Sequence, residues 1–210
     1  QAFDVVDPGS GEKIATVTSL KKADVDKAVD VAVDAFHNSG WARMQVAERA
    51  ACLHRIADAV EARKAEFATV EALDCGKIYD QALGDVQNFI DTFRYFADLS
   101  QAVNYRQVIA VKNHEAWVSR QAWGACGFII PWNFPFLLAG WGLAPALAAG
   151  NTCVLKPAED TPLSALYLCH VIQELELLPN GVLNVVTGLG ETAGAAVSQN
   201  PKFRRMSFTG

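Results

Sequence analysis

The sequence lacks the features that mark several classes of protein. No run of residues approaches the roughly 18 apolar residues that a membrane-spanning helix needs. The longest apolar stretch, residues 124–149, is interrupted by Asn133 and by three prolines. Positive charge is not in excess either, because the formal net charge is −5. These absences argue against a membrane protein and against a nucleic-acid or anionic-membrane partner.

Patterns that bind metals or form disulfide frameworks are also missing. The five cysteines are odd in number and contain no CxxC pair. The four histidines show no HxxxH or HExxH spacing. We therefore expect no metal site and a reducing compartment, the cytoplasm. The sequence begins at Gln1 without a methionine, so a removed targeting peptide and an organellar location stay open.

What is present is an ordinary globular composition, 51% hydrophobic and 20% charged. Residues 1–20 predict an edge hairpin around the turn formers Asp7–Gly11. Apolar residues at helical spacing then predict helices over 24–36, 48–73 and 81–99, with Gly76 as a left-handed cap between the last two. Residues 105–111 and 115–121 predict a second hairpin, which leaves the main body.

From Cys126 onward, strands and helices alternate. The expected strands are 126–130, 152–155, 182–187 and 204–208, and the expected helices are 136–149, 162–175 and 192–199. This order predicts an α/β fold, a Rossmann-like open parallel sheet with flanking helices, plus the protruding β-hairpin. Ligands bind beyond the carboxyl ends of such strands. Asn133, Lys156 and Glu159 follow the first two strands and are therefore candidate site residues.

Three motifs in this half resemble those of the NAD(P)-dependent aldehyde dehydrogenase superfamily. They are PWNFP at 131–135, APALAAGNT at 144–152 and KPAE at 156–159. The resemblance covers essentially the whole chain and matches the N-terminal part of the family. It implies a dinucleotide-binding domain at 1–103 and 123–210 and part of an oligomerisation domain at 104–122. It also implies that the catalytic domain, with the nucleophilic cysteine and the general base, lies outside these residues. From the residues alone, a surface hairpin of the same domain is the alternative for 104–122.

The resemblance assigns Asn133 to the oxyanion that forms when a cysteine thiolate attacks the aldehyde. From the residues alone, an Asx turn that caps the next helix is an alternative. Lys156 and Glu159 are assigned to the adenosine ribose of NAD. Glu159 should repel a 2′-phosphate, so NAD is preferred and NADP remains possible. A simple ion pair within the loop is the alternative for these two residues.

Gly188–Gly194 reads GxGxxxG between a strand and a helix, where backbone amides favour anions, although this pattern alone is weak. The residues that the resemblance places at the cofactor, besides Lys156 and Glu159, are Ile130, Pro131, Trp132, Gly190, Gly194, Phe208, Thr209 and Gly210. Those that it places at the aldehyde entrance are Phe134, Leu137, Leu138 and Trp141, with core packing as the alternative. Gly142 stands where some betaine-aldehyde members carry lysine, which argues against that substrate.

The implied reaction is NAD-dependent oxidation of an aldehyde to a carboxylic acid, through a thiohemiacetal and a thioester on a cysteine beyond Gly210. The implied assembly is a homodimer or a homotetramer. Because nucleophile and base are not in these 210 residues, we expect them to be inactive alone. Two alternatives stay open. One is a non-catalytic, truncated protein that binds a dinucleotide or forms oligomers, and the other is an acyl-phosphate-type dehydrogenase that uses NADP.

Overall fold

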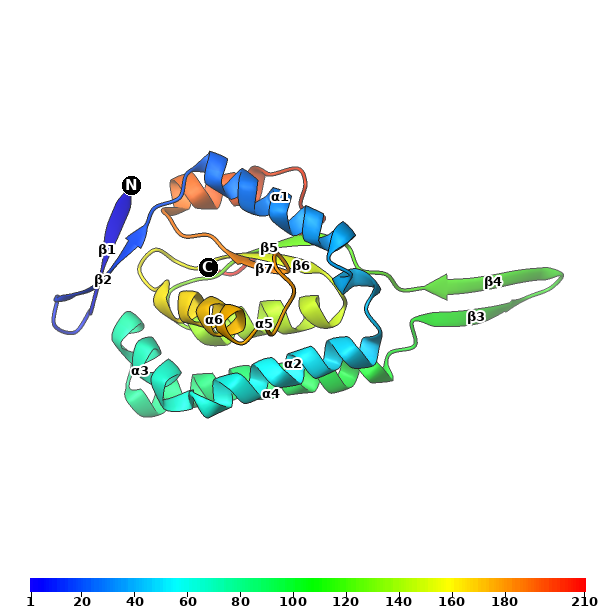
Figure 1. Ribbon diagram of the computed structural model, residues 1–210, viewed down its shortest axis with the longest axis horizontal. Helices are drawn as coiled ribbons and strands as arrows, with labels where there is room; N and C mark the ends of the chain where they lie inside the picture. The colour runs from blue at the N-terminus through cyan, green and yellow to red at the C-terminus, as the bar shows by residue number, and fades with distance from the viewer.

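The computed structural model describes residues 1–210, and the centre of the molecule is a four-stranded parallel sheet (Figure 1). Its strands are arranged in the order β7–β6–β5–β8. They are β5 (Ala125–Ile129), β6 (Thr152–Lys156), β7 (Leu183–Val185) and β8 (Arg205–Phe208). The predicted Rossmann-like open parallel sheet is therefore confirmed.

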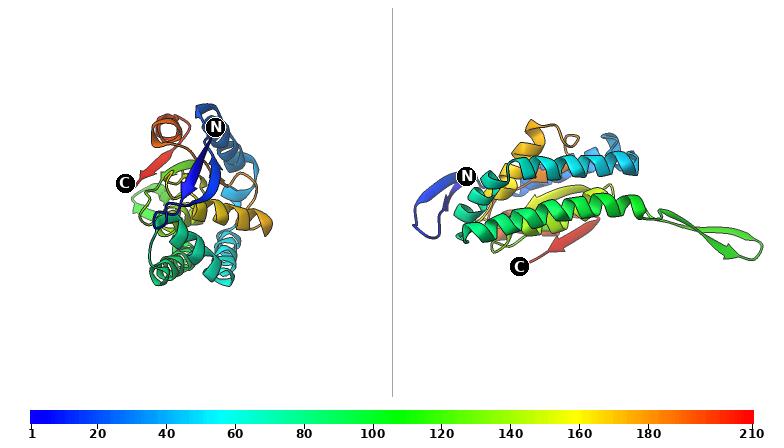
Figure 2. Two further views of the ribbon diagram at one scale, coloured as in Figure 1. Left: turned by 90° about the vertical axis from the view of Figure 1, so that its left-hand side faces the viewer. Right: turned by 90° about the horizontal axis from the view of Figure 1, so that it is seen from below.

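Helices cover both faces of this sheet (Figures 1 and 2). On one face lie α1 (Lys22–Asn38) and α7 (Ala195–Gln199), and on the other lie α5 (Pro135–Ala148) and α6 (Leu163–Glu174). Over α5 and α6 lie α2 (Val46–Ala62), α3 (Lys64–Cys75) and α4 (Tyr79–Ala102). A large apolar cluster fills this side and a smaller one lies beneath α1 and α7. Strand β6 is buried along its whole length, which explains its largely apolar sequence.

Two antiparallel hairpins lie at opposite ends of the molecule (Figure 1). The first pairs β1 (Ala2–Val6) with β2 (Lys13–Thr18) and lies at the end toward which the parallel strands point. The second pairs β3 (Arg106–Val111) with β4 (His114–Ser119) and extends away from the body, with nearly all of its side chains exposed. The prediction of a protruding hairpin is thus confirmed.

Several predicted elements were wrong in extent. The single helix predicted over 48–73 is two helices, α2 and α3, which meet at Arg63 with backbone angles of φ −115° and ψ 23°. The Arg63 guanidinium donates to Glu174 on α6 at 2.7 Å, so a long-range contact accompanies this break in a segment without glycine or proline. Gly76 ends α3 in the left-handed conformation, as predicted, with φ 72°.

The C-terminal elements are shorter than predicted. The strand expected over 182–187 spans only β7. The helix expected over 192–199 begins as a single π-helical turn, Gly190–Gly194, and α7 follows with five residues. A short 3₁₀ turn, Trp41–Arg43, joins α1 to α2. No helix in the chain combines the length and the apolar character that crossing a membrane requires.

Candidate active site and cofactor-binding residues

The carboxyl ends of β5 and β6 bring the two predicted motifs to the same edge of the sheet. Ile129 and Lys156 are partners in the parallel ladder. The Ile130 amide then donates to the Lys156 carbonyl oxygen at 3.1 Å. The PWNFP loop leaves β5 directly after this contact, and the KPAE loop leaves β6. Asn133 and Glu159 therefore lie on loops that start from neighbouring strands.

Asn133 is exposed, and its backbone is held by a residue far away in the sequence. Lys77 Nζ donates to the Asn133 carbonyl oxygen at 3.2 Å. Helix α5 starts after Phe134, whose side chain makes no capping hydrogen bond, and the Asn133 side chain donates or accepts no hydrogen bond at this helix start. The capping role that was the alternative for Asn133 is therefore not observed. The Asn133 amide is left free to donate to a group outside the chain.

Lys156 and Glu159 form a close ion pair at the end of β6. Lys156 Nζ and Glu159 Oε2 are 2.7 Å apart, and the lysine side chain is only 3% exposed. The other carboxylate oxygen, Oε1, accepts from the Gly190 amide at 3.1 Å. Glu159 thus joins the KPAE loop to the glycine turn after β7. The Glu159 carboxylate is about one-third exposed, and each of its two oxygens accepts a hydrogen bond from one of these two partners.

The pKa of Glu159 is lowered from its ordinary value by these partners. Partial burial by itself would raise this pKa, because it disfavours the charged form. The hydrogen bonds from Lys156 and from the Gly190 amide favour the carboxylate and outweigh the effect of burial. Glu159 is therefore an anion at neutral pH, which is the form that accepts hydrogen bonds from sugar hydroxyls.

An open cavity of about 640 Å³ lies beside this pair, between the KPAE loop and the β1–β2 hairpin. Trp132, Glu159 and Leu189 contribute to its wall, together with Asp74 from the end of α3. The Trp132 side chain is 60% exposed. Two loops that follow neighbouring strands thus share one cavity, and Trp132 is the member of the PWNFP loop that reaches it.

The other predicted cofactor residues differ in exposure. Ile130 is buried, and Phe208 at the end of β8 is 71% exposed. The Gly190 amide is engaged by Glu159, so it is not a free anion donor. A side-chain carbon at Gly194 would lie 3.9 Å from Lys156 Cε, so this glycine packs against the lysine stem. The glycine turn thus contacts both members of the Lys156–Glu159 pair.

The four residues predicted at the aldehyde entrance lie on the first two turns of α5 or just before them. Phe134 is 44% and Trp141 54% exposed, so neither ring is a core side chain. Leu137 and Leu138 are intermediate, and Leu138 also packs on the larger apolar cluster. Trp141 Nε1 donates to Asn88 Oδ1 on α4 at 2.8 Å. The exposed face of α5 is therefore continuous with the surface of α4.

Two of the five cysteines lie in the core of the parallel sheet. Cys126 and Cys153 are fully buried and are ladder partners on β5 and β6. Burial raises the pKa of Cys126 to about 11, and that of Cys153 is also well above its ordinary value. Neither is a thiolate at neutral pH, so both serve as small buried packing residues. No group of three or more His, Cys, Asp or Glu side chains is arranged to hold a metal ion.

A set of buried charges that was not predicted from the sequence lies next to the PWNFP loop. Glu71 and Asp74 on α3 are 0% and 1% exposed, and Lys77 follows them with a side chain that is 10% exposed. A signal was present, because Phe67, Glu71 and Asp74 recur at the spacing of the apolar face of α3. Acidic residues at such positions are a reason to expect a buried polar network.

Comparison with known proteins identifies the family. The family model described as "Aldehyde dehydrogenase family" matches residues 1–210. The chain belongs to the aldehyde dehydrogenase family. Among relatives of this aldehyde dehydrogenase chain, retinaldehyde dehydrogenase 3 of Mus musculus is 45% identical over 210 residues. Retinal dehydrogenase 2 of Homo sapiens is 43% identical over 212 aligned positions.

Solved structures of aldehyde dehydrogenases share its fold. The NAD+ complex of an aldehyde dehydrogenase from Bacillus cereus superposes with a TM-score of 0.96 at 39% identity and covers 100% of the chain. A betaine aldehyde dehydrogenase from Staphylococcus aureus in complex with NAD+ gives a TM-score of 0.94 at 30% identity, covering 99% of the chain. The chain spans less than half the length of these proteins. It covers 43% and 41% of the two solved structures and 41% of each of the two curated relatives. The alignments with these two relatives include 99% and 100% of the chain.

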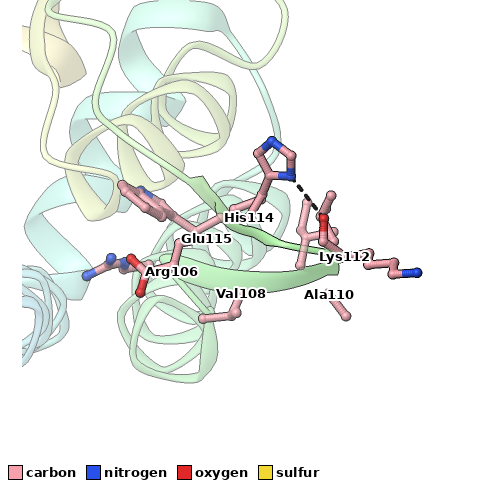
Figure 3. A pocket seen from close by; sticks show the side chains of 10 residues that line it. Arg106, Val108, Ala110, Lys112, His114 and Glu115 are labelled. Carbon is pink, nitrogen blue, oxygen red and sulfur yellow. Dashed lines mark hydrogen bonds between the residues drawn. The ribbon is translucent and has the colours of Figure 1, made fainter.

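The aldehyde dehydrogenase chain carries a second candidate surface, on the β3–β4 hairpin (Figure 3). Val108 and Trp117 are ladder partners and are 77% and 50% exposed. The Arg106 guanidinium lies 4.6 Å from the centre of the Trp117 ring. At the tip, His114 Nδ1 and the Lys112 carbonyl oxygen are 2.9 Å apart. Exposed apolar side chains on a two-stranded ribbon with free edges are typical of a surface that another chain covers.

Proposed function

We propose that this chain is the cofactor-binding part of an NAD-dependent aldehyde dehydrogenase that oxidises an aldehyde to a carboxylic acid. The observation that carries the proposal is the placement of Asn133 and the Lys156–Glu159 pair after neighbouring parallel strands. Dinucleotides bind at this edge of an open parallel sheet. The similarity to aldehyde dehydrogenases that were solved as NAD+ complexes supports the same cofactor here.

Asn133 is the residue of this chain that acts on the reacting atoms. A cysteine thiolate supplied from outside these residues attacks the carbonyl carbon, and negative charge develops on the carbonyl oxygen. The Asn133 side-chain amide donates a hydrogen bond to that oxygen. A preorganised donor of this kind is worth about 3 kcal/mol in the transition state. The free, exposed amide and its anchored backbone support this role.

Lys156 and Glu159 are the residues proposed to hold the ribose. The ammonium donates to a hydroxyl oxygen, and the carboxylate accepts from a hydroxyl hydrogen, so both polarities of a vicinal diol are matched. Bound NAD supplies the hydride acceptor. A 2′-phosphate would face the Glu159 carboxylate, and like charges at close range repel, so NAD is favoured over NADP. The remaining cofactor residues are proposed to be Ile130, Pro131, Trp132, Gly190, Gly194, Phe208, Thr209 and Gly210.

Two further parts of the proposal concern the substrate and the assembly. Phe134, Leu137, Leu138 and Trp141 are proposed to line the approach of the aldehyde, because the Phe134 ring just before α5 and the Trp141 ring on α5 are both exposed. Residues 104–122 are proposed to belong to an oligomerisation domain, with residues 1–103 and 123–210 forming the dinucleotide-binding domain. The exposed β3–β4 hairpin supports a homodimer or homotetramer.

The ribose clamp is tested with Glu159→Gln in the full-length enzyme that contains this chain, with NAD and NADP titrated separately. We expect NAD binding to weaken about tenfold, because hydrogen bonds to charged groups contribute about 1.5–3 kcal/mol. We also expect the ratio of NADP to NAD dissociation constants to fall, since the repulsion of the 2′-phosphate is removed. The matched control is Glu191→Gln, an exposed glutamate on the adjacent turn. An unchanged ratio would count against the clamp and favour the simple loop ion pair.

A further inference from the structure

Lys77 lies between α3 and α4 and contacts the active-site loop from behind. Its Nζ atom donates to the Asn133 carbonyl oxygen at 3.2 Å, across 56 residues of sequence. The same atom lies 4.7 Å from the centre of the Phe134 ring. A single ammonium group therefore contacts both Asn133 and Phe134, which lie in the loop between β5 and α5.

Two carboxyl groups hold this ammonium in place. Asp85 Oδ2 on α4 is 2.5 Å from Lys77 Nζ, and Glu71 Oε1 on α3 is 3.4 Å from it. Burial would lower the pKa of Lys77, but the hydrogen bond that its ammonium donates to Asp85 and the attraction of Glu71 outweigh burial and raise that pKa. Burial raises the pKa of Glu71, so Asp85 is the principal counterion. Lys77 is thus a fixed cation with a side chain only 10% exposed.

Glu71 fixes the other end of the same loop. Its Oε1 atom accepts from the Phe136 amide at 3.2 Å, in the first turn of α5. Pro135 has no amide hydrogen to donate, so Phe136 offers the first amide donor of that helix. The Phe136 ring is buried and stacks on Phe89 at 4.2 Å between centroids. The network of Lys77, Glu71 and Asp85 therefore holds a carbonyl before Pro135 and an amide after it.

We propose that Lys77, held by Asp85 and Glu71, is a positioning residue that sets the orientation of the Asn133 amide toward the reacting carbonyl oxygen. This inference rests on the oxyanion role of Asn133 in the proposed function. The exposed Asn133 side chain makes no hydrogen bond within the chain, whereas its own carbonyl group accepts from the largely buried Lys77 ammonium. A donor that is displaced by about 1 Å can cost about a hundredfold in rate. Holding the backbone is how the chain preorganises this donor.

The test is a double-mutant cycle in the full-length enzyme, with Lys77→Met, Asn133→Ala and the two combined. We expect Lys77→Met to lower kcat about ten- to a hundredfold, while the NAD dissociation constant changes less than about threefold. In the Asn133→Ala background, Lys77→Met should change kcat by less than about threefold, because the group that it positions is absent. Lys27→Met, which removes an exposed lysine from α1, is the control for the lost charge.

The outcomes separate a positioning role from a purely structural one. Equal losses of kcat in both backgrounds, or a Lys77→Met enzyme with normal kcat, would overturn the inference. If Lys77→Met does not fold, Lys77→Arg takes its place in the cycle, since it keeps a cation beside both carboxyl groups but changes the contact to the Asn133 carbonyl.

A readout without turnover distinguishes failure of this inference from failure of the proposed function. If the wild-type enzyme oxidises no aldehyde with NAD, the proposed function fails. Hydrogen exchange of the backbone amides in residues 132–136 then still reports on the loop. Faster exchange in Lys77→Met than in Lys27→Met supports anchoring of the loop by Lys77, and equal exchange overturns it.

Discussion

At the scale of single residues, two carboxyl groups near the cavity have opposite pKa shifts because their partners differ. Glu159 is about one-third exposed and pairs with Lys156, and its pKa is lowered. Asp74 is 1% exposed, and burial raises its pKa to about 7. Its Oδ2 atom accepts from the Leu163 amide at 2.7 Å, which only partly offsets the cost of burial. The two residues therefore influence stability in opposite directions as pH changes.

The raised pKa of Asp74 predicts a specific dependence of stability on pH. The folded chain binds this proton more tightly than the unfolded chain, so the stabilising contribution of the proton is present below about pH 4 and is lost as pH rises through about 7. We expect Asp74→Asn, which keeps an oxygen for the Leu163 amide, to raise the free energy of unfolding at pH 8 by about 2 kcal/mol. The substitution should also make the free energy of unfolding decline less steeply between pH 4 and 7.

Denaturant unfolding at a series of pH values measures this effect. The control is Asp160→Asn, which changes an exposed carboxylate on the neighbouring loop. A decline in stability between pH 4 and 7 that is as steep in Asp74→Asn as in the wild type would contradict the assignment to Asp74.

At the scale of elements, the contact between α4 and α5 positions the start of α5. Gly140 on α5 faces Phe89 on α4 so closely that a side-chain carbon there would lie 2.7 Å from the Phe89 ring and 3.4 Å from its Cα atom. Phe89 in turn stacks on Phe136, at the beginning of α5. A glycine is thus needed for the approach of two helices, although its backbone is helical and glycine disfavours a helix interior.

We predict that Gly140→Ala lowers the free energy of unfolding by about 1–3 kcal/mol, because overpacking forces Phe89 or α4 to move. Gly84→Ala on α4 is the matched control, since no atom lies within 4 Å of the position that its new carbon would take. That substitution should stabilise the chain by about 0.5–1 kcal/mol through helix propensity alone. Denaturant midpoints compare the two variants, and similar shifts of the same sign would contradict this account of the contact.

At the scale of the whole molecule, the β3–β4 hairpin is the part that the main body does not cover. Its strands pair only with each other, and it extends away from the sheet and its helices (Figure 2). A two-stranded ribbon by itself is marginally stable in water. Cover by a second chain would protect its edges and bury Val108 and Trp117.

We therefore predict that Val108→Lys causes the full-length enzyme to form assemblies with fewer subunits than the wild type. Light scattering after size-exclusion chromatography measures this as a lower molar mass. A lysine on an exposed edge carries charge that pairing with another strand would have to bury. Val6→Lys is the control, because it places the same change on the other hairpin, at a valine that is 46% exposed. Identical masses for the Val108→Lys and wild-type enzymes would contradict the proposed role of the hairpin.

The order of elements and the two loop motifs were open to prediction because they are local properties of the sequence. Apolar runs and turn residues indicate the strands and helices, and parallel strands necessarily present their following loops at one edge. The sequence alone therefore predicted that Asn133 and Glu159 lie on loops at the same edge of the sheet. The roles of the individual site residues stay predictions that await the experiments above.

Local sequence by itself determined the alternation of strands and helices in the second half of the chain and the residues that follow β5 and β6. Only the tertiary structure decided the break between α2 and α3 at Arg63, the burial of Glu71 and Asp74, and the grip of Lys77 on the Asn133 carbonyl group. The physical reason is that burial of a charged group costs free energy unless a partner of opposite charge or a hydrogen-bonding group lies next to it. Lys77 and Asn133 are 56 residues apart in the sequence, so no local sequence pattern predicts their contact.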